Sequence, residues 1–218
     1  MMFNGALTPG KVAAEKAVFQ RWSWARQFRH PVFCIADPLT LGEDPIVLGW
    51  YLGASGRNAL PALLEPVLAA IRDRAPQCRT LGFGSSGGGF AALGGTLLGL
   101  LDEAIVINPQ IDALKFEVQS AVKDFLRKRN GTACDSDLKA YDMSRMKPGA
   151  RIFYLQNRFD RHHLDIHYRP FRETCTAAGL ASRISFIEYE DEKAGHMPPN
   201  MADMEKILGE PFSTLLKA

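Results

Sequence analysis

The chain has 218 residues, of which 46% are apolar and 23% are charged, the composition of one ordinary soluble domain with a single core. Its 26 basic residues nearly balance its 24 acidic residues, so it lacks the strong positive field of a nucleic-acid-binding protein and we expect no nucleic-acid partner. We interpret the basic cluster Lys123, Arg127, Lys128 and Arg129 as a solvated helix face.

Short β-rich runs alternate with longer helical patterns along the chain. Runs such as "AIVIN" and "IFYL" are apolar on both faces, which is typical of strands covered by helices on both sides. The pattern predicts one α/β domain over 1–218, a doubly wound three-layer sandwich around a mainly parallel sheet of about seven strands. The predicted strands are 17–22, 31–36, 45–52, 79–84, 103–108, 151–156 and 183–189, and the predicted helices are 59–75, 88–101, 112–129, 164–179 and 201–218.

The connection over 109–150 is longer than the others and contains a helix followed by a polar stretch. It predicts a helical insertion that covers the carboxyl edge of the sheet.

The four cysteines, Cys34, Cys78, Cys134 and Cys175, are irregularly spaced and form no C-x-x-C pair, so we expect reduced thiols. The first twenty residues contain no apolar signal-peptide core, and no run of about eighteen apolar residues occurs. We therefore expect a cytoplasmic protein without a membrane span. Nothing in the sequence indicates the oligomeric state.

The stretch "GFGSSGGGF" at 82–90 joins a predicted strand to a predicted helix. Gly82, Gly84 and Gly87 fit the dinucleotide-binding pattern G-x-G-x-x-G. That pattern also needs an acidic residue at the end of the next strand to bind a ribose, where this chain has Asn108. Nucleotide binding is therefore the weaker interpretation, and no P-loop motif is present.

The same stretch fits G-x-S-x-G once, with Ser86 between Gly84 and Gly88. A strand that turns sharply into a helix needs small residues two positions before and after the serine, and Ser85 fails this test because Phe83 precedes it. A serine hydroxyl needs a base to accept its proton. The chain offers Asp160 after one predicted strand and His196 after the next.

The order Ser86, Asp160, His196 is that of the α/β-hydrolase fold, and from about residue 17 to its end the chain resembles a member of that superfamily. The resemblance implies that Ser86 is the nucleophile, His196 the general base and Asp160 the acid that orients the histidine.

The same resemblance implies an oxyanion hole made by the Gly87 amide and an amide from the loop after 31–36. That loop, "DPLTLGED", lacks the H-G motif common in esterases. The second donor is therefore left open between Asp37 and Leu39, since Pro38 has no N–H.

A narrower resemblance rests on "ADPLTL", "GWYLG", "GSSGGGFAAL" and "INPQ". These phrases are similar to small bacterial α/β-hydrolase-like proteins associated with surface polysaccharide production. The resemblance implies acyl chemistry on a glycan.

Two alternatives concern the segment "DRHHLD". Asp165 competes with Asp160 as the acid, because an acid at 160 could instead cap the following helix. His162, His163 and His167 form a candidate metal set, but we prefer surface and helix-capping roles for them, and we expect no metal and no cofactor.

The site predicts a serine esterase that forms an acyl-enzyme, with a small-molecule or glycan acyl ester as substrate. One alternative is an acyltransferase or deacylase that acts on a polysaccharide. An alternative of another class is a non-catalytic α/β-hydrolase-like partner in a biosynthetic assembly.

Overall fold

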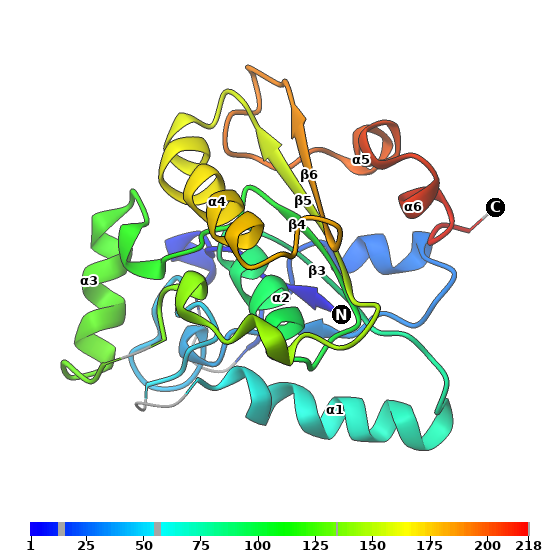
Figure 1. Ribbon diagram of the computed structural model, residues 1–218. Coiled ribbons are helices and arrows are strands. Elements are labelled where there is room, and N and C mark those ends of the chain that lie inside the picture. Colours follow the sequence, from blue (N-terminus) through cyan, green and yellow to red (C-terminus); the bar gives the residue numbers. More distant parts are fainter. Residues whose placement is uncertain (13–15, 55–57, 134, 218) are drawn as a thin grey trace.

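The fold is built on a six-stranded parallel sheet, which we describe from a computed structural model (Figure 1). The structure describes the whole chain except residues 13–15, 55–57, 134 and 218. The sheet has the order β2-β1-β3-β4-β5-β6. The strands are β1 (Met2–Phe3), β2 (Cys34–Ile35), β3 (Leu81–Ser85), β4 (Glu103–Ile107), β5 (Arg151–Asn157) and β6 (Ile184–Tyr189).

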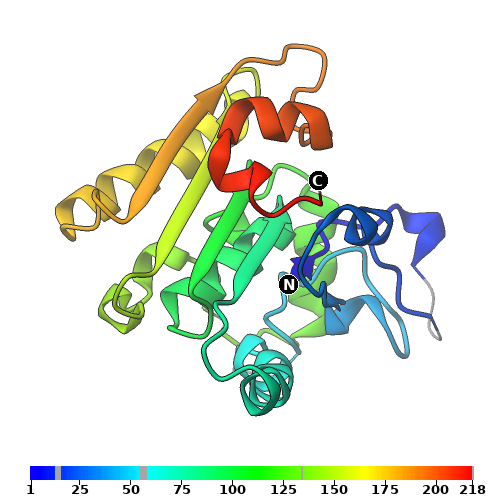
Figure 2. The ribbon, with the colours of Figure 1, turned by 90° about the vertical axis from the view of Figure 1, so that its right-hand side faces the viewer.

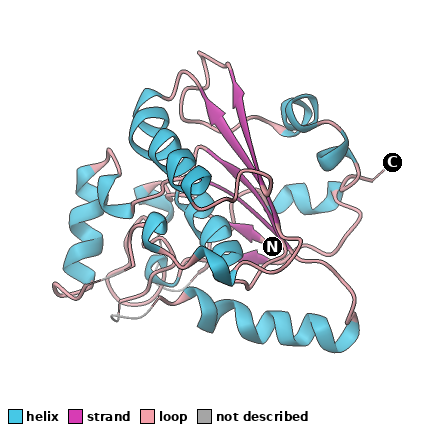
Figure 3. Ribbon diagram, viewed as in Figure 1, coloured by secondary structure: helices cyan, strands magenta, loops and turns pink. Residues whose placement is uncertain are grey.

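Helices cover both faces of this sheet, as Figures 2 and 3 show. The α-helices are α1 (Leu60–Arg74), α2 (Gly87–Leu97), α3 (Gln119–Lys128), α4 (Arg169–Ala177), α5 (Met201–Leu208) and α6 (Glu210–Ser213). Short 3-10 turns lie at Pro9–Lys11, Trp22–Gln27, Pro38–Thr40, Ala113–Lys115, Leu138–Ala140 and Met143–Arg145. Among the described residues, no helix combines the length and apolar character needed to cross a membrane.

Two apolar clusters hold the three layers together. On one face, α1, α2 and α4 pack on the sheet through residues such as Leu64, Phe90 and Phe171. On the other face, α5 and α6 contribute Met204 and Phe212. The predicted three-layer α/β/α sandwich is confirmed, with six strands in the described part of the chain.

In the first 52 residues two of the three strand predictions are wrong, and the third, 31–36, forms only as the two-residue strand β2. Segments 17–22 and 45–52 are not strands. Within 45–52, Trp50 and Tyr51 both have positive φ angles, 51° and 59°, which an extended strand cannot accommodate. The strand β1 was not predicted, because a run of two residues carries no alternation signal, yet it lies between β2 and β3.

Most predicted helices form with shifted ends. The segment 112–129 begins with a 3-10 turn and becomes the α-helix α3 only at Gln119. The segment 164–179 opens with a π-helix at His163–Tyr168 before α4. The segment 201–218 is interrupted at Gly209, whose φ of 60° separates α5 from α6.

The described cysteines Cys34, Cys78 and Cys175 are free thiols, as expected. Cys134 lies outside the described residues.

Candidate active site

Ser86 occupies the sharp turn between β3 and α2, at the carboxyl edge of the sheet. Its φ of 55° and ψ of −126° lie outside the regions that ordinary residues favour. Its amide donates to the Ile107 carbonyl at 3.0 Å, which ties the turn to the end of β4. This is the strained conformation that the G-x-S-x-G spacing predicts.

The glycines around Ser86 are explained by close contacts between backbones. A Cβ on Gly84 would lie 2.3 Å from the Gly88 carbonyl oxygen, and a Cβ on Gly88 would lie 2.5 Å from the Phe3 carbonyl oxygen. A Cβ on Gly89 would lie 2.7 Å from Pro109. Strands β1 and β3, helix α2 and the loop after β4 therefore meet at distances that only glycine permits.

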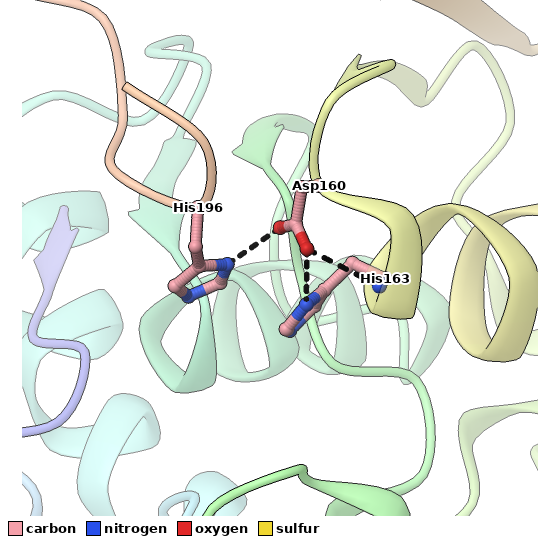
Figure 4. Close-up of side chains that lie close together, drawn as sticks. All are labelled: Asp160, His163 and His196. Atoms are coloured by element: carbon pink, nitrogen blue, oxygen red, sulfur yellow. Dashed lines mark hydrogen bonds and ion pairs between the residues drawn. The ribbon is translucent and has the colours of Figure 1, made fainter. Parts of the chain in front are cut away.

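Asp160 and His196 contact each other, although they follow different strands (Figure 4). Asp160 follows β5 and accepts a hydrogen bond from Nδ1 of His196, which follows β6, at 2.6 Å. The competing Asp165 is exposed and forms an ion pair with Arg169. The geometry thus brings Asp160, and not Asp165, to the histidine.

A second histidine, His163, shares Asp160 with His196 (Figure 4). Its Nδ1 lies 3.1 Å from Oδ1 of Asp160, while His196 bonds Oδ2. The two imidazole rings stack with their centroids 4.2 Å apart. His163 and His167 are fully buried, so the prediction of surface positions for them is wrong. The segment folds inward because its π-helix presents both histidines to the core.

Gln110 connects this pair to the serine and fixes the protonation of His163. The Trp50 indole N–H donates to Oε1 of Gln110 at 3.2 Å, which leaves the Gln110 amide nitrogen to face the site. That nitrogen donates to Ser86 Oγ at 2.7 Å and lies 3.1 Å from Nε2 of His163. His163 Nε2 must therefore accept, so His163 is neutral with its proton on Nδ1, directed at Asp160.

The pKa shifts agree with this assignment. Burial raises the pKa of Asp160, but the hydrogen bonds from His163 and His196 outweigh it and hold that pKa well below its usual range. Burial lowers the pKa of His163, against the opposing effect of Asp160. The site therefore holds an ionised carboxylate between two imidazoles, one of which stays neutral.

Two buried asparagines hold the loop that carries His196. Asn157 donates to the carbonyls of Asp191 and Gly195, both at 2.7 Å. The Asn108 side chain donates from Nδ2 to the His196 carbonyl at 3.1 Å, and its Oδ1 accepts from the backbone N–H of Asn157 at 2.8 Å. Asn108, which stands where a nucleotide-binding protein has its ribose carboxylate, thus supports the histidine loop instead.

Of the residues predicted for the oxyanion hole, Gly87 lies where it was expected, whereas Asp37 and Leu39 belong to a separate hydrogen-bonded turn. Gly87 begins α2 directly after Ser86, as expected. Asp37, however, is buried and accepts from the amides of Leu39, Gly49 and Tyr51. Burial raises the pKa of Asp37 above its usual value, although these hydrogen bonds partly oppose the shift. The Leu39 amide is therefore already bonded, and the loop after β2 acts as a brace for Gly49–Tyr51.

The loop after β1 approaches Ser86. A Cβ on Gly5 would lie 3.6 Å from the Ser86 Cβ. Strand β1 is the neighbour of β3 in the sheet, so its loop begins beside the serine turn. The segment after β2 reaches the same turn further along the chain, because Leu48 lies against Gly87.

A metal could be held by one group of donors in the described part of the chain, Asp160, His163 and His196, whose ligand atoms lie within 4.8 Å of one another. These atoms already bond one another. The candidate set of His162, His163 and His167, which we set aside, does not form such a group: His162 Nε2 bonds the Lys115 carbonyl, and His167 Nδ1 accepts from the Ile111 amide.

Comparison with known proteins shows the fold. No family model and no curated protein sequence matches the chain. The capsule O-acetyltransferase of Neisseria meningitidis serogroup A superposes with a TM-score of 0.64 at 16% identity, over 97% of this chain and 87% of that one. An S-formylglutathione hydrolase from Agrobacterium tumefaciens superposes with a TM-score of 0.54 at 16% identity, over 98% and 83%. The chain has an α/β-hydrolase-type fold.

The residues that sequence reasoning missed are Gln110, His163, Asn108 and Asn157. All four are polar and fully buried: Asn157 is the last residue of β5, Asn108 and Gln110 follow β4, and His163 begins the π-helix after β5. Polar side chains that directly follow apolar strands, as in "INPQ", were the available signal for Asn108 and Gln110.

Proposed function

We propose that this protein is a serine-dependent acyl-ester hydrolase with Ser86 as nucleophile, His196 as general base and Asp160 as the orienting acid. The observation that carries the proposal is the strained Ser86 turn at the same sheet edge as the Asp160–His196 hydrogen bond. Such a turn lifts a serine hydroxyl clear of the sheet, and such a bond directs the far ring nitrogen of the histidine outward.

The reaction proceeds in two acyl-transfer steps. His196 Nε2 takes the Ser86 proton while Oγ attacks the ester carbonyl, and the carbonyl oxygen becomes an oxyanion that the Gly87 amide stabilises. The C–O bond then breaks, and the alcohol leaves with the proton from His196. A water molecule, deprotonated by His196, hydrolyses the acyl-enzyme and restores the serine.

Asp160 supports this cycle with both carboxylate oxygens in use. Its Oδ2 bonds His196, where it keeps the proton on Nδ1 and balances the imidazolium charge. Its Oδ1 bonds neutral His163, which orients the carboxylate. A neutral His163 is required here, because two stacked imidazolium rings would repel each other.

A second candidate function is O-acyl transfer to a glycan hydroxyl. It is favoured by the superposition on the capsule O-acetyltransferase, one structure of which is a complex with CoA, at a TM-score of 0.65 and 16% identity. The first half of the reaction is the same, and a sugar hydroxyl replaces water in the second.

Labelling with a fluorophosphonate probe tests the proposal, because only an activated serine reacts. We expect labelling of the native protein and its loss in Ser86→Ala, together with a fall of about 10⁴ to 10⁶ in kcat on phenyl acetate. Ser85→Ala is the matched control and should remain labelled.

An unlabelled native protein would instead favour the non-catalytic partner. The two enzymatic candidates are separated by mass spectrometry of the acyl-enzyme after a glycan acceptor is added. Transfer predicts an acylated acceptor, and hydrolysis predicts the free acid only.

A further inference from the structure

Arg21 stands in an unusual backbone position beside the proposed nucleophile. Its φ is 55°, in the left-handed region that residues with side chains seldom adopt. Hydrogen bonds fix the residue before it: the Gln20 amide donates to Asn4 Oδ1 at 2.8 Å, and Gln20 Nε2 donates to the Ala6 carbonyl at 2.9 Å. The segment around Arg21 is therefore bound firmly to the loop after β1.

This arrangement places the guanidinium one residue away from Ser86. Arg21 Nη2 donates to Ser85 Oγ at 2.8 Å. The same Gln20 accepts from the Gly5 amide at 2.9 Å, and Gly5 borders Ser86. Arg21 thus lies against Ser85, the residue that directly precedes the proposed nucleophile.

Arg21 forms no ion pair with a carboxylate among the residues that the structure describes. Its other contact is the Trp24 ring, 5.6 Å from the guanidinium carbon. Burial lowers the pKa of Arg21 to about 10, so the group stays charged at neutral pH in surroundings that disfavour the charge.

The segment around Arg21 also has an excess of positive charge. Residues 1–36 contain five basic residues and one acidic residue. Arg21 is half-buried, and among the described residues Ser85 alone accepts a hydrogen bond from its guanidinium. A guanidinium with free donors binds planar carboxylates and phosphates through paired hydrogen bonds.

We propose that Arg21 binds an anionic group of the substrate, a carboxylate or a phosphate, and so makes the enzyme selective for negatively charged acyl esters. The proposal rests on the proposed function, because it takes Ser86 as the reacting centre. It adds a specificity-determining residue that the triad does not include.

Four aryl esters test this selectivity: phenyl acetate, which is neutral, 4-acetoxybenzoate, 4-acetoxyphenyl phosphate and phenyl hydrogen succinate. The last places a carboxylate on the acyl side, and the two before it place a carboxylate or a phosphate on the alcohol side. In Arg21→Gln, we expect the kcat/KM ratio of at least one anionic ester to phenyl acetate to fall about tenfold or more, mainly through KM. The ester with the largest fall identifies the group and its side.

Two further variants separate binding from structure. Arg21→Lys keeps the charge and should recover part of the ratio. Arg26→Gln removes an exposed arginine of the same 3-10 turn, at Trp22–Gln27, and should leave all four rates unchanged. An equal fall for all four esters in Arg21→Gln, or ratios that do not change, would overturn the proposal.

Calorimetry in the Ser86→Ala background keeps this test independent of catalysis. Titration with 4-acetoxyphenyl phosphate, 4-acetoxybenzoate and phenyl hydrogen succinate should give Kd values, at least one of which rises about tenfold when Arg21→Gln is added. If the native protein hydrolyses none of the esters, the proposed function fails, and these Kd values alone decide the role of Arg21. Absent binding, or Kd values that Arg21→Gln leaves unchanged, would refute it.

Discussion

The two halves of the site are held in place by different forces. The serine half depends on backbone contacts within 82–90 and against β1, at distances that admit no Cβ. Apart from the local bond between Asp160 and His163, the acid–histidine half depends on side-chain hydrogen bonds between residues 34 to 88 positions apart in the chain. Close backbone packing requires glycines at neighbouring positions, which can be recognised in the sequence. Long-range hydrogen bonds require no such local pattern.

Within the acid–histidine half, the largest effect is expected from the substitution of Asp160. Asp160→Asn should lower kcat on phenyl acetate by about 10⁴, because an amide permits the wrong tautomer of His196. Asp165→Asn is the matched control and should have little effect, since Asp165 is exposed. Similar rates in the two variants would remove Asp160 from the mechanism. A chelator should change neither rate, and recovery of activity on adding a metal would support a metal at Asp160, His163 and His196 instead.

The serine half can be broken by a single methyl group. Gly88→Ala should lower the free energy of unfolding by about 3 kcal/mol, because its Cβ would meet two backbone oxygens, Phe3 O at 2.5 Å and Asn4 O at 2.7 Å. Gly94→Ala lies in the same helix with its nearest neighbour, a Leu138 side-chain atom, at 3.4 Å. It should raise stability by up to about 1 kcal/mol. Urea unfolding measures both changes, and equal values would contradict the close approach of β1 and α2.

Gln110 joins the two halves and offers a third test. Gln110→Ala should lower kcat about tenfold and the free energy of unfolding by about 2 kcal/mol, because it leaves the buried Trp50 N–H and His163 Nε2 without partners. Gln119→Ala, at the start of α3, is the control. An unchanged kcat in Gln110→Ala would show that its bond to Ser86 has no catalytic role.

The smallest effect concerns His167 and the dependence of stability on pH. Burial lowers its pKa to about 2, and its Nε2 has no hydrogen-bond partner. In the unfolded chain this histidine has an ordinary pKa of about 6.5 and binds a proton below that pH, whereas in the folded chain it stays neutral. Acid therefore favours unfolding below about pH 6.5. Each such histidine contributes a loss of about 1.4 kcal/mol per pH unit.

Urea unfolding between about pH 7 and 5 should show this slope. It should become shallower in His167→Gln, while substitution of the exposed His30 should leave it unchanged. An identical slope in His167→Gln would mean that His167 accepts a proton in the folded protein.

The layers of the fold and the serine turn could be predicted from the amino-acid sequence. The strands β3 to β6 are short apolar runs between helical patterns, and the turn at Ser86 needs Gly84 and Gly88 because the backbones meet there. Both signals are local, so they can be read from neighbouring residues. The pairing of Asp160 with His196 was expected only as part of the resemblance to α/β-hydrolases.

The surroundings of that turn could not be predicted from the sequence, because they depend on how the chain folds. Two residues, Met2 and Phe3, become a central strand because the sheet supplies partners on both sides. The sharing of Asp160 by two histidines, the bridge through Gln110 and the approach of Arg21 to Ser85 each join residues distant in sequence. A hydrogen bond needs only a donor and an acceptor that meet in space. Their spacing along the chain therefore carries no information until the fold has brought them together.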